Sequence, residues 1–153
     1  MLLNGVNHVA ILTNDTERLA AFYRDVFEAE VDGQVAEEDG VRLTFIRIGE
    51  TAELNVFEVD GNTEADRQTP MFQRGRIDHL GLQAASIDAF DEIRRRLIER
   101  GASDEFVTDF GAILSVFFRD PDGLEGEVCV ANPEAVPGVT NPPGTPAARY
   151  VST

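Results

Sequence analysis

The chain has 153 residues, of which 42% are hydrophobic and 27% charged, a composition that fits one globular unit or two small modules sharing a core. Its formal net charge of −15 repels phosphate backbones and anionic lipids, which argues against nucleic acid or a membrane surface as partner. The single cysteine cannot form an internal disulfide, no apolar run reaches the ~20 residues that span a bilayer, and MLLNGVNHVAILTND lacks the pattern of a secretory signal. We therefore expect a soluble, cytoplasmic protein.

The first half begins with a strand and a helix. The letters NHVAIL, from Asn7 on, show the alternation of a strand. Asn14 followed by Glu17 resembles a capping box, so we expect a helix to start at Asn14. Apolar residues then recur at helical spacing, namely Leu19, Phe22, Tyr23, Val26 and Phe27. Three strands are expected next, around residues 29–36, 41–48 and 53–59, which gives the order βαβββ.

The second half repeats this order. The segment DHLGLQAASIDAFDEIRRRLIERG, from Asp78 on, predicts a strand and a helix with Ser86 as N-cap and Gly101 just past its end. The expected buried stripe of this helix is Phe90, Ile93 and Leu97. Three strands are expected around residues 105–110, 113–119 and 125–130. The sequence thus predicts an α+β fold of two βαβββ modules.

The boundaries follow from composition. We place the first module at residues 1–60, a polar, irregular linker at 61–75 and the second module at 76–131. The tail, 132–153, is too rich in proline and glycine to predict regular structure.

The two histidines of the chain, His8 and His79, occupy the same place in the repeat, inside the first strand of each half, and lie 79 − 8 = 71 residues apart. Glu53 and Glu127 lie in the last strand of each half, 45 and 48 residues after the respective histidine. Two neutral imidazoles with one or two carboxylates suit one divalent first-row metal ion, such as Fe, Mn, Ni, Co or Zn. We therefore expect a metal site.

The stretches NHVAILTNDTERLAAFYRDVF, IDHLGLQAASIDAFDEIRRRL and, most specifically, FFRDPDGLEGEV resemble the vicinal oxygen chelate superfamily, which includes glyoxalase I, extradiol dioxygenases and bleomycin-binding proteins. The resemblance covers about residues 5–131 and implies curved mixed sheets around a central cleft, with metal ligands on the first and last strands. The family's pattern falls on His8, His79 and Glu127. The remaining position falls on Glu53, with a shift to Asn55 left open.

The resemblance implies an enzyme whose metal chelates a small oxygen-rich substrate and stabilises an oxyanion or enolate. Glu127 or Glu53 would move the proton in lyase, isomerase or epimerase chemistry. An extradiol ring-cleaving dioxygenase is the alternative, although that branch commonly uses a further histidine that this chain lacks. A bleomycin-resistance-like protein that binds a cationic small molecule is the non-enzyme alternative. We expect a homodimer, because the family commonly builds its sites across a dimer interface.

Two other features have simpler interpretations. Cys129 has no basic neighbour to activate it, so we expect it to fill the core. The run Arg94, Arg95 and Arg96 could bind an anion, but on a helix it is more typical of a solvated face.

Overall fold

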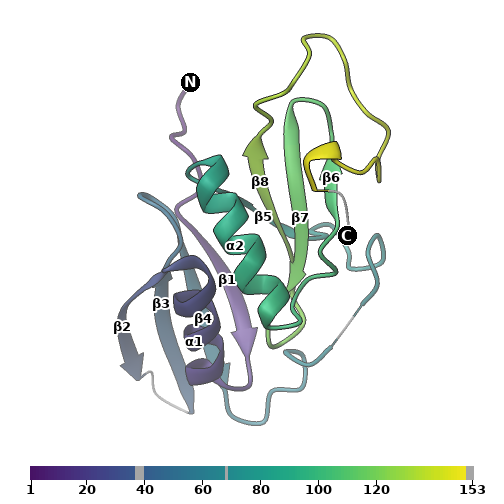
Figure 1. Cartoon of the computed structure of the whole chain (residues 1–153). Helices are drawn as coiled ribbons and strands as arrows, with labels where there is room; N and C mark the ends of the chain where they lie inside the picture. Colours follow the sequence, from purple (N-terminus) through teal and green to yellow (C-terminus); the bar gives the residue numbers. More distant parts are fainter. Residues whose placement is uncertain (37–39, 68, 151–153) are drawn as a thin grey trace. The chain divides into compact units, whose positions relative to one another are not determined.

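The connectivity of the chain is the same in both halves, as the computed structural model shows for residues 1–36, 40–67 and 69–150 (Figure 1). The chain divides into two compact units. The first is Met1–Gln68 with the turn Pro121–Gly123, and the second is Thr69–Asp120 with Leu124–Thr153. Each has a four-stranded mixed sheet and one α-helix within the described residues. The predicted α+β fold of two βαβββ modules is therefore confirmed.

In the first unit, the last strand of the module lies inside the sheet, whose order is β1-β4-β3-β2. Strand β4 runs parallel to β1 and antiparallel to β3. The elements are β1 (His8–Thr13), α1 (Thr16–Phe27), β2 (Glu30–Ala36), β3 (Val41–Arg47) and β4 (Glu53–Val59).

The second unit repeats this arrangement with the order β5-β8-β7-β6, so that β8 takes the place of β4. It adds a short 3-10 helix, η1, near the end of the chain. The elements are β5 (Leu80–Gln83), α2 (Ile87–Glu99), β6 (Val107–Asp109), β7 (Ile113–Arg119), β8 (Glu125–Ala131) and η1 (Ala148–Tyr150). None of the described helices is long and apolar enough to cross a membrane.

The helix ends follow local side-chain chemistry. Helix α2 begins as predicted at Ser86, whose hydroxyl accepts from the Ala89 N–H at 3.1 Å, and Gly101 follows it with φ of +62°. The predicted start of α1 at Asn14 is wrong by one residue. Asp15 is the N-cap, because its carboxylate accepts from the Arg18 N–H at 3.0 Å and also places negative charge at the helix N-terminus.

Each sheet buries one face against its helix. In the first unit, Leu19 and Val26 of α1 and Leu54 and Val56 of β4 are fully buried. In the second unit Phe90, Leu97 and Val116 are fully buried, and Val128 is 1% exposed. Because side chains alternate along a strand, the opposite faces of β4 and β8 carry Glu53, Asn55, Glu127 and Cys129.

The turn before β8 is built by aspartates. Asp120 accepts from the Leu124 N–H through its carboxylate at 2.9 Å and donates its own N–H to the Leu124 carbonyl at 3.1 Å. Asp122, within the first unit, accepts from the Thr13 hydroxyl at 2.6 Å and from Arg18 at 2.5 Å. The two ends of this turn, Asp120 and Leu124, are thus bonded to each other before β8 begins.

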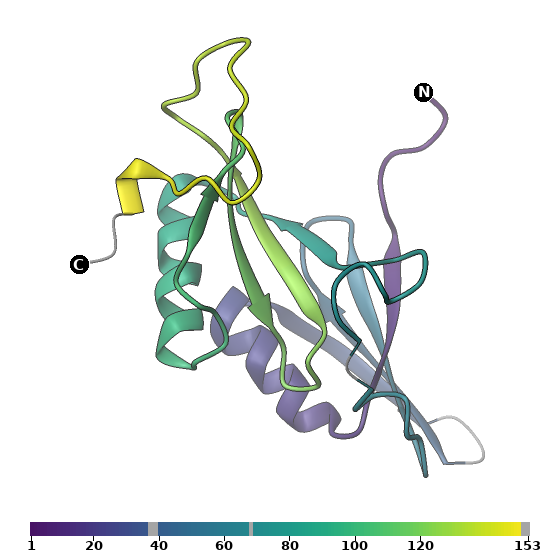
Figure 2. The same ribbon diagram turned by 90° about the vertical axis from the view of Figure 1, so that its right-hand side faces the viewer.

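The tail has more structure than its composition predicts (Figure 2). The Ala147 N–H donates to the Val107 carbonyl at 2.9 Å, the Asp109 N–H donates to the Thr145 carbonyl at 2.8 Å, and Pro146 forms a bridge with Thr108. The reason is that β6 is an edge strand whose backbone groups need partners, and a proline-rich segment can supply carbonyls to them. Residues 151–153 of the predicted tail lie outside the described residues.

Glu58 generates a prediction about stability and pH. Contacts with Thr16, at the N-terminus of α1, and with Arg42 hold the pKa of the Glu58 carboxyl at about 2, below its ordinary value of 4.5. A lowered pKa stabilises the fold above pH 4.5, and this contribution is lost as the pH falls toward 2. We expect Glu58→Gln to lower the free energy of unfolding by about 1–2 kcal/mol at pH 7 and by less at pH 3, in urea titrations.

The control is Glu50→Gln, which changes an exposed glutamate and should alter neither value. An equal cost of Glu58→Gln at both pH values would contradict the assignment.

Candidate metal-binding site

Glu127 is the centre of the candidate site in the second unit. It lies on β8, on the face away from α2, and its side chain is 14% exposed. The Ser115 hydroxyl on β7 donates to its Oε1 at 2.5 Å. Its Oε2 lies 3.3 Å from Nε2 of His79. The structure therefore brings together two of the predicted site residues, His79 and Glu127.

His79 lies one residue before β5, so its predicted position inside the first strand is wrong by one residue. The strand ladder begins only at Leu80, which pairs with Gly126. The His79 ring is held on two sides: Nδ1 lies 3.0 Å from Oδ2 of Asp78, and Phe117 packs edge-on at a centroid distance of 5.8 Å. With Nδ1 engaged, Nε2 is the nitrogen that faces Glu127.

The charges around His79 affect its protonation. The hydrogen bond to Asp78 is the main cause that raises the pKa of the imidazole, and Glu127 adds to it, while burial acts in the opposite direction. The same hydrogen bond lowers the pKa of Asp78, with help from the Phe72 N–H. A protonated His79 has no lone pair for a metal, so Asp78 both orients the ring and strengthens the competition by protons.

The segment before His79 is fixed by hydrogen bonds, although its composition predicts an irregular linker. Asp78 Oδ1 accepts from the Phe72 N–H at 2.5 Å. Arg74 donates to the carbonyls of Thr69 and Asp78 and, at 2.7 Å, to the carboxylate of Glu125 at the start of β8. This clamp ties the residues before β5 to β8, the strand that carries Glu127.

The first unit holds its histidine in the same way. Nδ1 of His8 lies 2.8 Å from Oδ1 of Asn7, the residue before it. The corresponding distance in the second unit, from Nδ1 of His79 to Oδ2 of Asp78, is 3.0 Å. His8 is exposed, and it pairs in the strand ladder with Glu53. Asn55, two residues further along β4, has a buried side-chain oxygen with no hydrogen-bond partner among the described residues.

Each unit thus offers one imidazole and at least one oxygen donor on the face away from its helix. Among the described residues, no three His, Cys, Asp or Glu side chains gather into a metal-binding group. The donor types nevertheless suit a divalent ion, because Nδ1 of each histidine is occupied, Nε2 of His79 faces a carboxylate, and the buried amide oxygen of Asn55 has no partner among the described residues.

The sequence analysis missed four residues that position these donors, namely Asn7, Asp78, Ser115 and Phe117. A signal for the first two was present: each histidine directly follows a residue with a side-chain oxygen, in the pairs NH and DH. Ser115 and Phe117 gave no signal, because only the antiparallel ladder of β7 and β8 places Phe117 opposite Glu127 and Ser115 opposite Cys129.

The remaining sequence candidates form no separate site. The expectation that Cys129 fills the core is wrong, because it is half-buried on the face of β8 away from α2. Burial, followed by the neighbouring Glu127, raises the pKa of the Cys129 thiol to about 11, so the thiol stays protonated at neutral pH. Arg94 donates to the Glu105 carbonyl and stacks on Tyr150, while Arg95 and Arg96 pair with Glu92. These internal partners account for the basic run without an anion.

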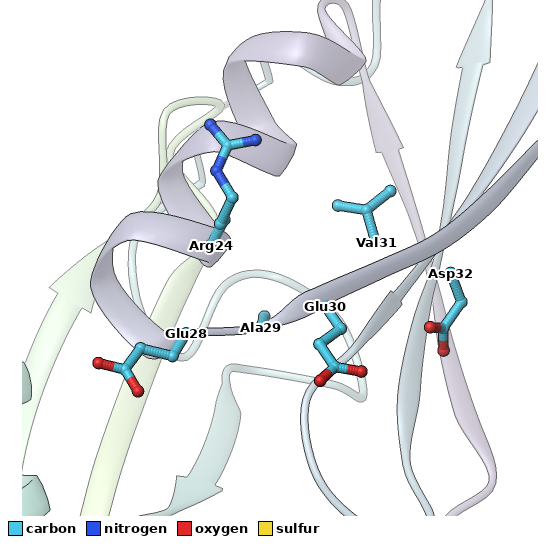
Figure 3. Close-up of a pocket in the computed structure, with 6 residues that line it drawn as sticks. All are labelled: Arg24, Glu28, Ala29, Glu30, Val31 and Asp32. Atoms are coloured by element: carbon cyan, nitrogen blue, oxygen red, sulfur yellow. The ribbon is translucent and has the colours of Figure 1, made fainter.

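An open hollow of about 650 Å³ lies at the end of α1 and the start of β2 (Figure 3). None of the predicted site residues lines it; its lining is Arg24, Glu28, Ala29, Glu30, Val31 and Asp32. The carboxylates of Glu30 and Asp32 are already paired with Arg47, at 2.6 and 2.7 Å. The hollow therefore does not compete with Glu127 as the candidate site.

Comparison with known proteins identifies the family. Residues 5–128 match the Glyoxalase/Bleomycin resistance protein/Dioxygenase superfamily, and the chain belongs to it. It is 29% identical over 105 residues to the mitochondrial methylmalonyl-CoA epimerase of Mus musculus, an alignment that covers 67% of this chain and 58% of the mouse protein. The chain thus spans less than two thirds of the curated relative that it matches.

Solved structures share the fold. A glyoxylase/bleomycin resistance protein/dioxygenase domain from Frankia sp. EAN1pec superposes with a TM-score of 0.69 at 21% identity, over 86% of this chain and 95% of that chain. The fosfomycin resistance protein FosX from Listeria monocytogenes, solved with Mn(II) and 1S,2S-dihydroxypropylphosphonic acid, gives 0.63 at 18% identity, over 87% and 97%. Members of the superfamily thus include enzymes and metal-binding proteins.

The Ser115–Glu127 hydrogen bond can be measured directly. Ser115→Ala leaves one oxygen of a half-buried carboxylate without its donor, so we expect the free energy of unfolding at pH 7 to fall by about 1.5–3 kcal/mol in urea titrations. In a Glu127→Gln background the same substitution should cost about 1 kcal/mol less, because the acceptor is then neutral. Identical costs in both backgrounds would show that the hydroxyl does not serve the carboxylate.

Proposed function

We propose that this protein is a divalent-metal-dependent enzyme of the glyoxalase type that moves a proton next to a carbonyl group of a small, oxygen-rich substrate. The observation that carries the proposal is the group formed by Ser115, Glu127 and His79, in which one carboxylate oxygen is fixed and the other faces an imidazole nitrogen. Such a group is suited to hold a metal ion and to exchange a proton at Glu127 Oε2.

The proposed ligands are His8 and His79 through Nε2 and Glu127 through its carboxylate, with Glu53 or Asn55 from the first unit as the fourth. A bound divalent ion supplies Lewis-acid stabilisation of negative charge on substrate oxygen. Asn7 and Asp78 orient the imidazoles through Nδ1. Ser115 donates to Glu127 Oε1, so Oε2 is the oxygen with a free position, and the same carboxylate would serve as ligand and, when loosely held, as base.

The relatives favour epimerase, isomerase or lyase chemistry over the other branches of the superfamily. Two curated relatives are named methylmalonyl-CoA epimerase, and inversion at a carbon beside a thioester carbonyl is achieved by removing and returning its proton. FosX, which shares the fold, was solved with Mn(II), so Mn(II) is the first metal to test. A homodimer in the cytoplasm stays a prediction of the sequence.

Metal content tests the ligand set. Protein purified without chelator should contain about one divalent ion per chain by inductively coupled plasma analysis. His8→Ala and His79→Ala should each lower the affinity for Mn(II) by orders of magnitude, and Glu127→Gln should lower it at least tenfold. Arg95→Gln, which changes a surface ion pair, is the control and should bind like the original protein. Unchanged binding in both histidine variants would show that the histidines serve the fold, and would favour a binding protein.

Proton transfer tests the chemistry. With Mn(II) bound and methylmalonyl-CoA as probe, the proton beside the thioester carbonyl should exchange with deuterium from D2O, as followed by NMR. Glu127→Gln should slow this exchange by about 10²-fold or more, because an amide cannot accept the proton. If metal-loaded protein gives no exchange while catechol substrates consume oxygen, the dioxygenase alternative replaces the proposal.

A further inference from the structure

The two sheets repeat the same ladder around their inner strands, and this repeat identifies equivalent residues. In the second unit, Glu127 lies between Gly81 on β5 and Phe117 on β7. In the first unit, Asn55 lies between Ala10 on β1 and Phe45 on β3. Gly81 and Ala10 each lie two residues after the histidine of their unit. The residue equivalent to Glu127 is therefore Asn55.

Glu53 is equivalent to a different acid. It lies opposite Arg47 in the ladder, as Glu125 lies opposite Arg119. Glu125 is paired with Arg74 at 2.7 Å and lies 3.8 Å from Arg119. The acids at this position therefore face arginines at the strand ends, whereas the position two residues further on carries the candidate ligands.

The surroundings of Asn55 lack the partner that its oxygen needs. Its Oδ1 is buried, and no donor among the described residues reaches it. The residues beside it in the ladder, Ala10 and Phe45, have no polar side-chain atom to offer. A buried acceptor without a partner costs about 1–3 kcal/mol, so the Asn55 oxygen has a free position for a partner that the described residues do not supply.

We infer that Asn55, and not Glu53, supplies the oxygen ligand of the first unit, through its amide Oδ1. The inference rests on the proposed metal site. Each unit then contributes half of the ligand set, which we call a half-site. The half-site of the first unit is Asn7, His8 and Asn55, and that of the second is Asp78, His79 and Glu127. The two half-sites have equivalent positions in the ladder but differ in charge. Glu127 is then the single carboxylate of the ligand set, and Glu53 is dispensable for metal binding.

The test compares four variants of the full chain, stripped with chelator and titrated with Mn(II) by calorimetry and with Co(II) by visible absorption. Asn55→Ala should weaken Mn(II) binding at least tenfold and alter the Co(II) spectrum. Asn55→Asp, which keeps an oxygen at that position, should retain or increase the affinity. Glu53→Gln is the matched control two residues away on the same face, and should bind within about twofold of the original protein.

The fourth variant, Asn55→Leu, separates ligation from a role in folding. It replaces an unpartnered polar group by an apolar one of similar size, so the thermal midpoint of the metal-free protein should stay the same or rise, while the rise on adding Mn(II) should be lost. A residue needed only for the fold would instead lower the midpoint without metal and leave the metal-dependent rise intact.

The outcomes distinguish this inference from the proposed function. Weakened binding in Glu53→Gln together with unchanged binding in Asn55→Ala would overturn the inference and assign Glu53, while His8→Ala and Glu127→Gln would still support the metal site. If the original protein binds neither Mn(II) nor Co(II), both the proposed function and the inference are overturned.

Discussion

The arrangement of the candidate site depends on one constraint, the alternation of side chains along two inner strands. In β4, Leu54 and Val56 are fully buried beneath the helix, so Asn55 between them must project from the other face. In β8, Val128 and Val130 impose the same condition on Glu127 and Cys129. A slip of one residue in either ladder would exchange the two faces, so the packing of the core and the position of the ligands are fixed together.

The register of β8 is secured at the strand's start. The Asp120–Leu124 hydrogen bonds set the residue at which β8 begins, and Gly126 fixes its contact with β7. A side chain at Gly126 would lie about 2.2 Å from the Phe118 ring, so glycine is needed for Phe118 to pack over the strand directly before Glu127. The turn DPDG and Gly126 thus set where β8 begins and how it packs, directly before Glu127.

Periodicity and repetition in the sequence were sufficient for the fold, the caps of α2 and the pairing of His79 with Glu127, because each depends on contacts that recur at fixed spacing. Three features could not be predicted from such spacing and became visible only in the structure. The cap of α1 depends on which of two adjacent polar residues reaches the Arg18 N–H. The order in the tail depends on the unpaired edge of β6. The choice between Glu53 and Asn55 stayed open in the sequence because both share one face of the strand and lie 53 − 8 = 45 and 55 − 8 = 47 residues after His8, against 127 − 79 = 48 in the second half, and only the ladder shows which of them is equivalent to Glu127.

The comparison of the two half-sites also bears on where proton transfer can occur. Duplicated modules keep their ladder because it is fixed by the core, whereas residues that face away from the core can change with little cost to the fold. At the two positions considered with each histidine the change is one of charge: the first unit has the amides of Asn7 and Asn55, and the second has the carboxylates of Asp78 and Glu127. An amide orients an imidazole or donates an oxygen as a carboxylate does, but it cannot take up a proton near neutral pH. Under the proposed function, the acid-base capacity would therefore lie in the second unit, where Ser115 holds one oxygen of Glu127 and leaves the other facing His79.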